Sequence, residues 1–164
     1  MNGIQLALST LHRGEQHMAT ELAAVADRHR TDHEIHHVAT DIAAWSREHV
    51  QRLAEASSRH GGAASDSPHN GLPTGLLRAP QHGLSEHGGT RSDSRLLLLD
   101  DLHDLHLAAT HNSLHWEMLA QVAQATSAAA LLTLASSCHP QTLRQMHWTN
   151  TMIKTLSAQT LSSV

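Results

Sequence analysis

The chain of 164 residues contains no phenylalanine and no tyrosine, and its aromatic residues are three tryptophans. Strands are enriched in aromatic and β-branched residues, whereas leucine and alanine are strong helix formers. The core must therefore be built from Leu, Ala, Met, Ile and Val together with Trp45, Trp116 and Trp148. The shortage of strand-forming residues predicts an all-α protein.

Cysteine, long apolar runs and basic charge are also scarce. Cys138 is the single cysteine, which excludes an intramolecular disulfide and is typical of a reducing compartment, so we expect a cytoplasmic protein. No stretch approaches the ~20 apolar residues of a membrane span, and no secretory signal is visible. A formal charge of −4 provides no basic field. We therefore expect neither a membrane nor a nucleic acid as a partner.

Two amphipathic patterns occupy the first third of the chain, with apolar residues spaced alternately four and three apart. This spacing places them on one helix face, which another helix covers. The first face consists of Ile4, Leu8, Leu11, Glu15, Met18, Leu22 and Val25, and the second of Ile35, Val38, Ile42, Trp45, His49 and Leu53. Because burying an unpaired carboxylate is expensive, Glu15 needs a cation, a proton or a metal beside it.

The chain is expected to form one domain, 1–164, with helices over 2–29, 32–59, 94–125 and 128–160. The region 61–93 is rich in Gly, Ser, Pro and His, and we expect it to be a long connection. Helices joined by a few residues must be antiparallel, whereas a long crossover lets the third helix run parallel to the second. The sequence thus predicts an antiparallel four-helix bundle with a crossover between helices two and three.

The third helix has two candidate apolar faces, and the fourth has one. Two seams compete in the third helix: one is His103, Leu107, His111, Leu114, Met118 and Val122, and the other is Leu99, Leu102, His106, Ala109, Trp116 and Ala120. This breadth is typical of a dimer face, and we expect a homodimer. The seam expected in the fourth helix is Leu132, His139, Leu143, Met146, Asn150 and Ile153, with His147 beside it.

Three segments carry a resemblance to a known superfamily. The run from Trp45 to Leu53 (WSREHVQRL) resembles the metal-binding second helix of ferritin-like proteins, especially the rubrerythrin-like and small stress-protein branches. Glu15 falls where that superfamily has its first-helix glutamate, and the segment 141–147 (QTLRQMH) is similar to its fourth helix. The resemblance implies a ferritin-like four-helix bundle and a dinuclear centre of four carboxylates and two histidines.

The carboxylates of that centre are largely missing here. Ser46 and Arg144 stand three residues before His49 and His147, where the resemblance implies glutamates, and no carboxylate lies between His111 and His115. Two iron ions require carboxylates to neutralise their charge. We therefore do not expect ferroxidase or peroxidase activity.

Two interpretations remain open. In the first, Glu15, His49, His111 and His147, with His115 in reserve, bind one transition metal ion (zinc, iron, copper or nickel) in a protein of metal handling or stress response. In the second, a buried ion pair between Glu15 and Arg144 replaces the metal in a helical interaction module.

The 17 histidines also form pairs outside this centre. His33 and His37 are spaced four residues apart, as are His111 and His115, and two imidazoles at this spacing can share a metal. At this histidine density, such spacings also arise by chance.

Overall fold

The computed structural model describes residues 2–61 and 91–162. These residues form four helices and no strand, which confirms the all-α prediction for the described part of the chain. The helices are α1 (Gly3–Arg28), α2 (His33–Arg59), α3 (Arg91–Ala125) and α4 (Ala129–Leu161). None of them is both long and apolar enough to cross a membrane.

Side-chain caps define where the first two helices begin. The side chain of Asn2 accepts a hydrogen bond from the backbone N–H of Gln5, whose own side chain accepts one from the Asn2 backbone, so α1 starts with a capping box. Asp32 caps α2 by accepting from the N–H of Ile35. Further along, α4 continues through Pro140 without ending there.

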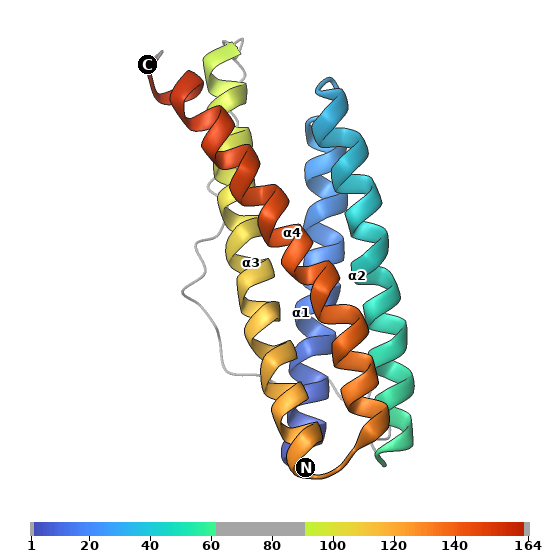
Figure 1. Ribbon diagram of the computed structural model, residues 1–164. Helices are drawn as coiled ribbons and strands as arrows, with labels where there is room; N and C mark the ends of the chain where they lie inside the picture. Colours follow the sequence, from blue (N-terminus) through green and yellow to red (C-terminus); the bar gives the residue numbers. More distant parts are fainter. Residues whose placement is uncertain (1, 62–90, 163–164) are drawn as a thin grey trace, which may run out of the picture.

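The four helices lie side by side (Figure 1), and contacting residues follow opposite orders along α1 and α3. Arg28 near the end of α1 contacts Asp101 near the start of α3. Glu15 in the middle of α1 contacts Trp116, which is further along α3. In the view of Figure 1, α1 and α4 rise while α2 and α3 descend. The expected crossover over 61–93 lies largely outside the described residues.

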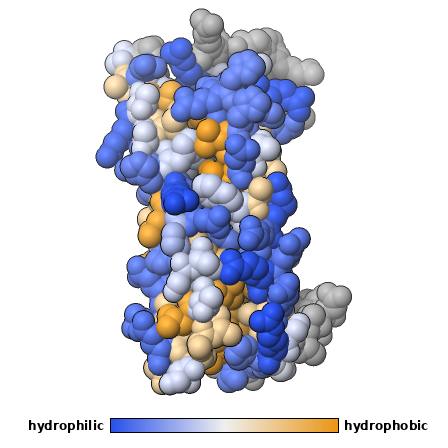
Figure 2. Space-filling view, turned by 45° about the vertical axis from the view of Figure 1, so that its right-hand side comes forward, coloured by the Kyte–Doolittle hydropathy of each residue, from blue (hydrophilic) through white to orange (hydrophobic). Residues whose placement is uncertain are grey.

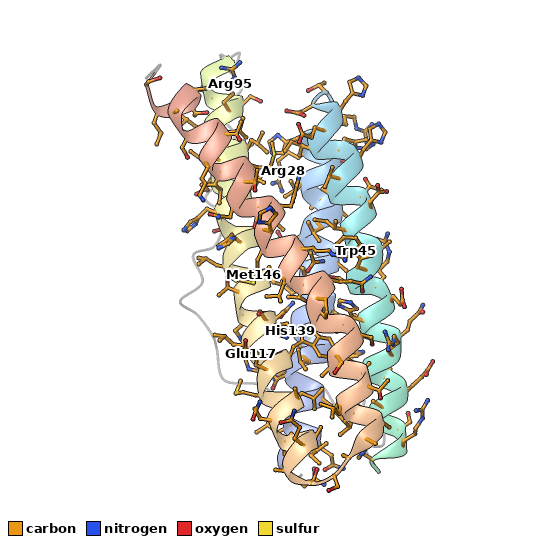
Figure 3. The ribbon with its side chains drawn as sticks, viewed as in Figure 1. Arg28, Trp45, Arg95, Glu117, His139 and Met146 are labelled. Carbon is orange, nitrogen blue, oxygen red and sulfur yellow. The ribbon has the colours of Figure 1, made fainter. Side chains whose placement is uncertain are left out.

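The interior contains two apolar clusters. One includes Met18, Ile35 and Leu102, and the side chains of Trp45 and Met146 pack against it (Figure 3). The other cluster consists of Leu8, Leu11, Leu53, Ala56, Trp116, Leu119, Ala123, Leu131, Leu134, Ala135 and Cys138. Between these clusters, along the helices, lies a layer of buried polar residues. The surface turned toward the viewer in Figure 2 is mainly hydrophilic, with apolar patches near its upper and lower ends.

The structure distinguishes between the two seams of α3. Leu102, Ala109 and Trp116 of the second seam are buried. In the first seam, by contrast, Leu107 and Leu114 are more than half exposed. The second seam therefore covers the core, and the first faces outward because α1 and α4 both contact the other side of α3.

The seam expected for α4 is wrong by about one residue. Leu143, which was expected inside, is 46 % exposed, whereas the adjacent Thr142 is fully buried. The residues that α4 buries are Leu131, Leu134, Ala135, Cys138, Thr142, Gln145, Thr149, Met152 and Thr160. Thr142, Gln145 and Thr149 lie in the middle of this row, so a hydrophobicity pattern does not detect it. Hydrogen bonds to the other helices keep these three side chains inside.

Candidate functional site

The centre of the polar layer is an ion pair between α1 and α2. Glu15 and His49 each have an exposed fraction of 0 %, and His49 Nδ1 lies 3.2 Å from Glu15 Oε1. His49 Nδ1 makes no hydrogen bond within the described residues. The distance nevertheless places an imidazole directly against the carboxylate. The expectation that Glu15 has a partner inside the bundle is therefore met by His49.

Two further helices contribute donors to the same carboxylate oxygen. The indole Nε1–H of Trp116 on α3 donates to Glu15 Oε1 over 2.9 Å, and the hydroxyl of Thr142 on α4 lies 3.5 Å from the same atom. Oε2 of Glu15 has no hydrogen-bond partner among the described residues. The carboxylate is thus held on one side, and all four helices converge on it.

His49 is held as a cation by its neighbours. Its Nε2 lies 2.8 Å from Oε1 of Gln141, an oxygen that only accepts, so Nε2 carries a proton. Burial lowers the pKa of His49, but its contacts with Cys138 and with the charged Glu15 outweigh burial and raise the pKa to about 10. The Glu15–His49 contact is therefore an ion pair at neutral pH.

A second set of hydrogen bonds extends the layer between α2 and α4. The side-chain amide of Gln145 donates to the backbone oxygen of Ile42 over 3.1 Å and to Ser46 Oγ over 3.0 Å. Both Ser46 and Gln145 are fully buried. Ser46 is the residue at which the ferritin-like resemblance implies a carboxylate, and here its hydroxyl accepts from a neutral amide.

The other predicted metal ligands, and the predicted ion-pair partner Arg144, lie elsewhere. His111 and His147 are exposed, His115 is half-buried, and Arg144 is exposed rather than beside Glu15. Within residues 2–61 and 91–162, no group of three or more His, Cys, Asp or Glu side chains is placed to hold a metal ion. Of the predicted four-ligand set, the structure brings together only Glu15 and His49. Relative to the expected seam, α4 is rotated so that positions 144 and 147 face outward, whereas His111 lies on the outward face of α3.

Sequence reasoning missed four members of this centre: Trp116, Cys138, Gln141 and Thr142. Trp116 belonged to the second of the two competing α3 seams, so the sequence predicted its burial only if that seam faced the core. Thr142 and Gln145 are three residues apart, a spacing that shares a helix face. That spacing was the available signal for a polar row on α4, but polar residues on helices usually face solvent.

The centre is closed. Glu15, His49 and Thr142 are fully buried and Gln141 is half-buried, and two surface hollows of about 200 and 360 Å³ are lined by other residues. A nucleophile or base needs access to a substrate, and Cys138 is fully buried. The arrangement is therefore suited to aligning the four helices.

The chain matches no protein-family model, no curated protein and no solved structure with which it was compared. The resemblance to ferritin-like proteins stays a prediction.

Proposed function

We propose that this protein is a helical interaction module that forms a homodimer through the outer face of α3, with the Glu15–His49 pair, in place of a metal, as a structural part of its core. The proposal includes a ferritin-like connectivity of the bundle. The opposite order of contacts along α1 and α3 supports that connectivity, as does the course of the helices in Figure 1.

A row of exposed apolar side chains on α3 is the observation that carries the proposal. Leu107, Leu114 and Met118 are 54 %, 55 % and 52 % exposed, and we call these three residues the α3 stripe. They lie seven and four residues apart, which places them on one face of the helix. Exposed apolar side chains gathered on one face, in contrast to single scattered ones, indicate an interaction site.

The core does not need the α3 stripe. A different face of α3 packs inside the bundle and includes the fully buried Trp116 and Ala109. A surface helix of a monomer needs only one apolar face, and α3 has two. The second face is therefore available for another chain.

The α3 stripe is complementary to a second copy of itself. A two-fold axis that crosses α3 between Thr110 and His111 places Leu107 opposite Leu114 of the second copy, and Leu114 opposite Leu107. A two-fold interface pairs the same patch on both subunits in this reciprocal way. The apolar residues then meet at the centre of the contact.

Charges beside the α3 stripe favour the same antiparallel register. By helical position, Asp104 and His115 lie on one side of the stripe and His103 and Glu117 on the other. Within one chain His103 Nδ1 also lies 3.5 Å from Asp104 Oδ1, and Glu117 is exposed on α3 (Figure 3). When two copies pair about the axis, Asp104 approaches the second copy's His115, and Glu117 approaches the second copy's His103. Each acid thus meets a histidine, which favours this pairing over contact with an acidic partner.

Light scattering on the untagged full chain, in the absence of metal, measures its molar mass and so tests whether it forms the proposed dimer. The variant carrying Leu107→Glu and Leu114→Glu should be a monomer with the helix content of the wild type. Burial of a leucine contributes about 1.5–3 kcal/mol, so each substitution should weaken the dimer at least about tenfold.

A matched control substitutes two leucines of similar exposure outside the stripe. Leu6 and Leu161 are 55 % and 60 % exposed, and Leu6→Glu with Leu161→Glu should leave the dimer intact. If the wild-type chain is a monomer, the α3 stripe has a different occupant and the proposal is overturned. The proposal is also overturned if both double variants weaken the dimer equally.

A further inference from the structure

We propose that His111 and His115 hold a divalent transition metal ion, such as zinc, at the side of the α3 stripe, and that the ion joins two copies of the chain. This inference rests on the proposed dimer. The two imidazole rings have centroids 4.3 Å apart and are tilted by 35°. Residues four apart share a helix face, and two histidines at that spacing are a known pair of zinc ligands.

A hydrogen bond prepares one of these rings for ligation. His115 Nδ1 lies 2.9 Å from the backbone oxygen of His111. Because a carbonyl oxygen only accepts, Nδ1 carries the proton, which leaves Nε2 as the nitrogen that can bind a metal ion. Metal-binding histidines ordinarily donate their other ring N–H to such an acceptor, which fixes the tautomer and the direction of the ring.

The other histidine pair at this spacing lacks these features. The rings of His33 and His37 have centroids 6.0 Å apart, and no hydrogen bond within the described part of the chain holds either ring. Both residues are exposed at the beginning of α2. The pair offers the same two side chains at the same spacing on the same kind of surface, so it serves as a matched control.

Two imidazoles alone leave a zinc site incomplete. Zinc is bound by four ligands in structural sites, at about 2.0–2.1 Å from each nitrogen. The described residues of a single chain bring no third His, Cys, Asp or Glu into such a group. In the two-fold register, the second copy's Asp104 approaches His115 and supplies a carboxylate. Symmetry then produces two identical sites in each dimer.

The test measures the dimer dissociation constant of the untagged full chain by sedimentation equilibrium, with EDTA and with zinc chloride. The complete site exists only in the dimer, so zinc should stabilise the dimer. At a zinc concentration about ten times the Kd of the site, each bound ion should lower the dimer dissociation constant roughly tenfold. His111→Ala with His115→Ala should abolish the zinc effect while leaving the dimer in EDTA. His33→Ala with His37→Ala should keep the zinc effect.

The outcomes separate this inference from the proposed function. If the chain dimerises equally with EDTA and zinc, the metal site is overturned and the dimer stands. A zinc effect that survives His111→Ala with His115→Ala, or that disappears in the His33 and His37 control, also overturns the site. A chain that stays monomeric under both conditions overturns the dimer and the bridging ion together.

Discussion

His49 Nδ1 lies 3.2 Å from Oε1 of Glu15, with both side chains fully buried, so a charged pair occupies the middle of the polar layer between the two apolar clusters. Breaking a buried pair by removing one partner leaves an uncompensated charge, whereas replacing both partners with apolar residues is often neutral or stabilising. The two partners also link α1 to α2, the first hairpin of the bundle. The pair therefore predicts a distinct pattern of stabilities.

The first prediction concerns removal of one or both partners of this pair. Glu15→Ala should lower the free energy of unfolding by about 3–5 kcal/mol, because the buried imidazolium loses its counter-charge. The double variant Glu15→Met with His49→Leu should be destabilised less than a variant in which only one of the two partners is replaced. Urea unfolding followed by circular dichroism provides the free energies. A double variant less stable than both single variants would show that the pair contributes net stability.

The second prediction is a dependence of stability on pH between 6.5 and 10. The pKa of His49 rises from 6.5 to about 10 in the folded protein. A raised folded-state pKa adds stability that is complete below the unfolded-state pKa and is lost as the pH rises through the folded-state pKa. The free energy of unfolding should therefore fall by about 1 kcal/mol per pH unit across this interval.

Two variants test whether His49 causes this slope. The charged or titratable groups that face its ring are Glu15 from α1 and Cys138 from α4. His49→Gln should flatten the slope, whereas His17→Gln, at an exposed position on α1, should retain it. Urea unfolding at several pH values measures both. An unchanged slope in His49→Gln would assign the pH dependence to another group.

The third prediction concerns the hydrogen bond from Trp116 to Glu15. Trp116→Phe removes the Nε1–H that donates to Oε1 over 2.9 Å and leaves a gap beside a buried carboxylate. Loss of a hydrogen bond to a charged group costs about 1.5–3 kcal/mol, and the missing ring atoms add to this cost. In the Glu15→Met background, only the packing cost should remain. Equal losses in both backgrounds would contradict a role for the hydrogen bond.

The fourth prediction concerns Gly14, which allows α1 to approach α3 next to Glu15. A Cβ atom at this position would clash with the side-chain oxygen of the buried Asn112. Gly14→Ala should therefore destabilise the protein, although alanine is favoured over glycine in helices by about 1 kcal/mol. When Asn112→Ala removes the obstacle, Gly14→Ala should become stabilising. A double-mutant cycle by thermal unfolding measures this change of sign, and additive effects would exclude the clash.

Local sequence patterns determined the all-α class and the inward faces of α1 and α2. The periodic rows of these helices contain Leu8, Leu11 and Leu22 in α1, and Ile35 and Leu53 in α2, all of which are fully buried. Glu15 and His49 were placed inside by the same rows, because a polar residue within an otherwise regular seam must share the seam's direction. The capping residues Asn2 and Asp32 likewise specify helix starts from local chemistry.

The tertiary structure alone decided how α3 and α4 face the bundle. Both seams of α3 have helical spacing, so their hydrophobicity cannot show which one α1 and α4 will cover. On α4, the hydrogen bonds of Gln145 to Ile42 and Ser46 on α2 keep a polar residue inside, whereas Leu143 remains outside. The local pattern predicts that the Gln145 amide faces solvent, but polar groups on α2 accept its hydrogen bonds inside the bundle. That pairing turned Arg144 and His147 outward, and it left His49 as the cation beside Glu15.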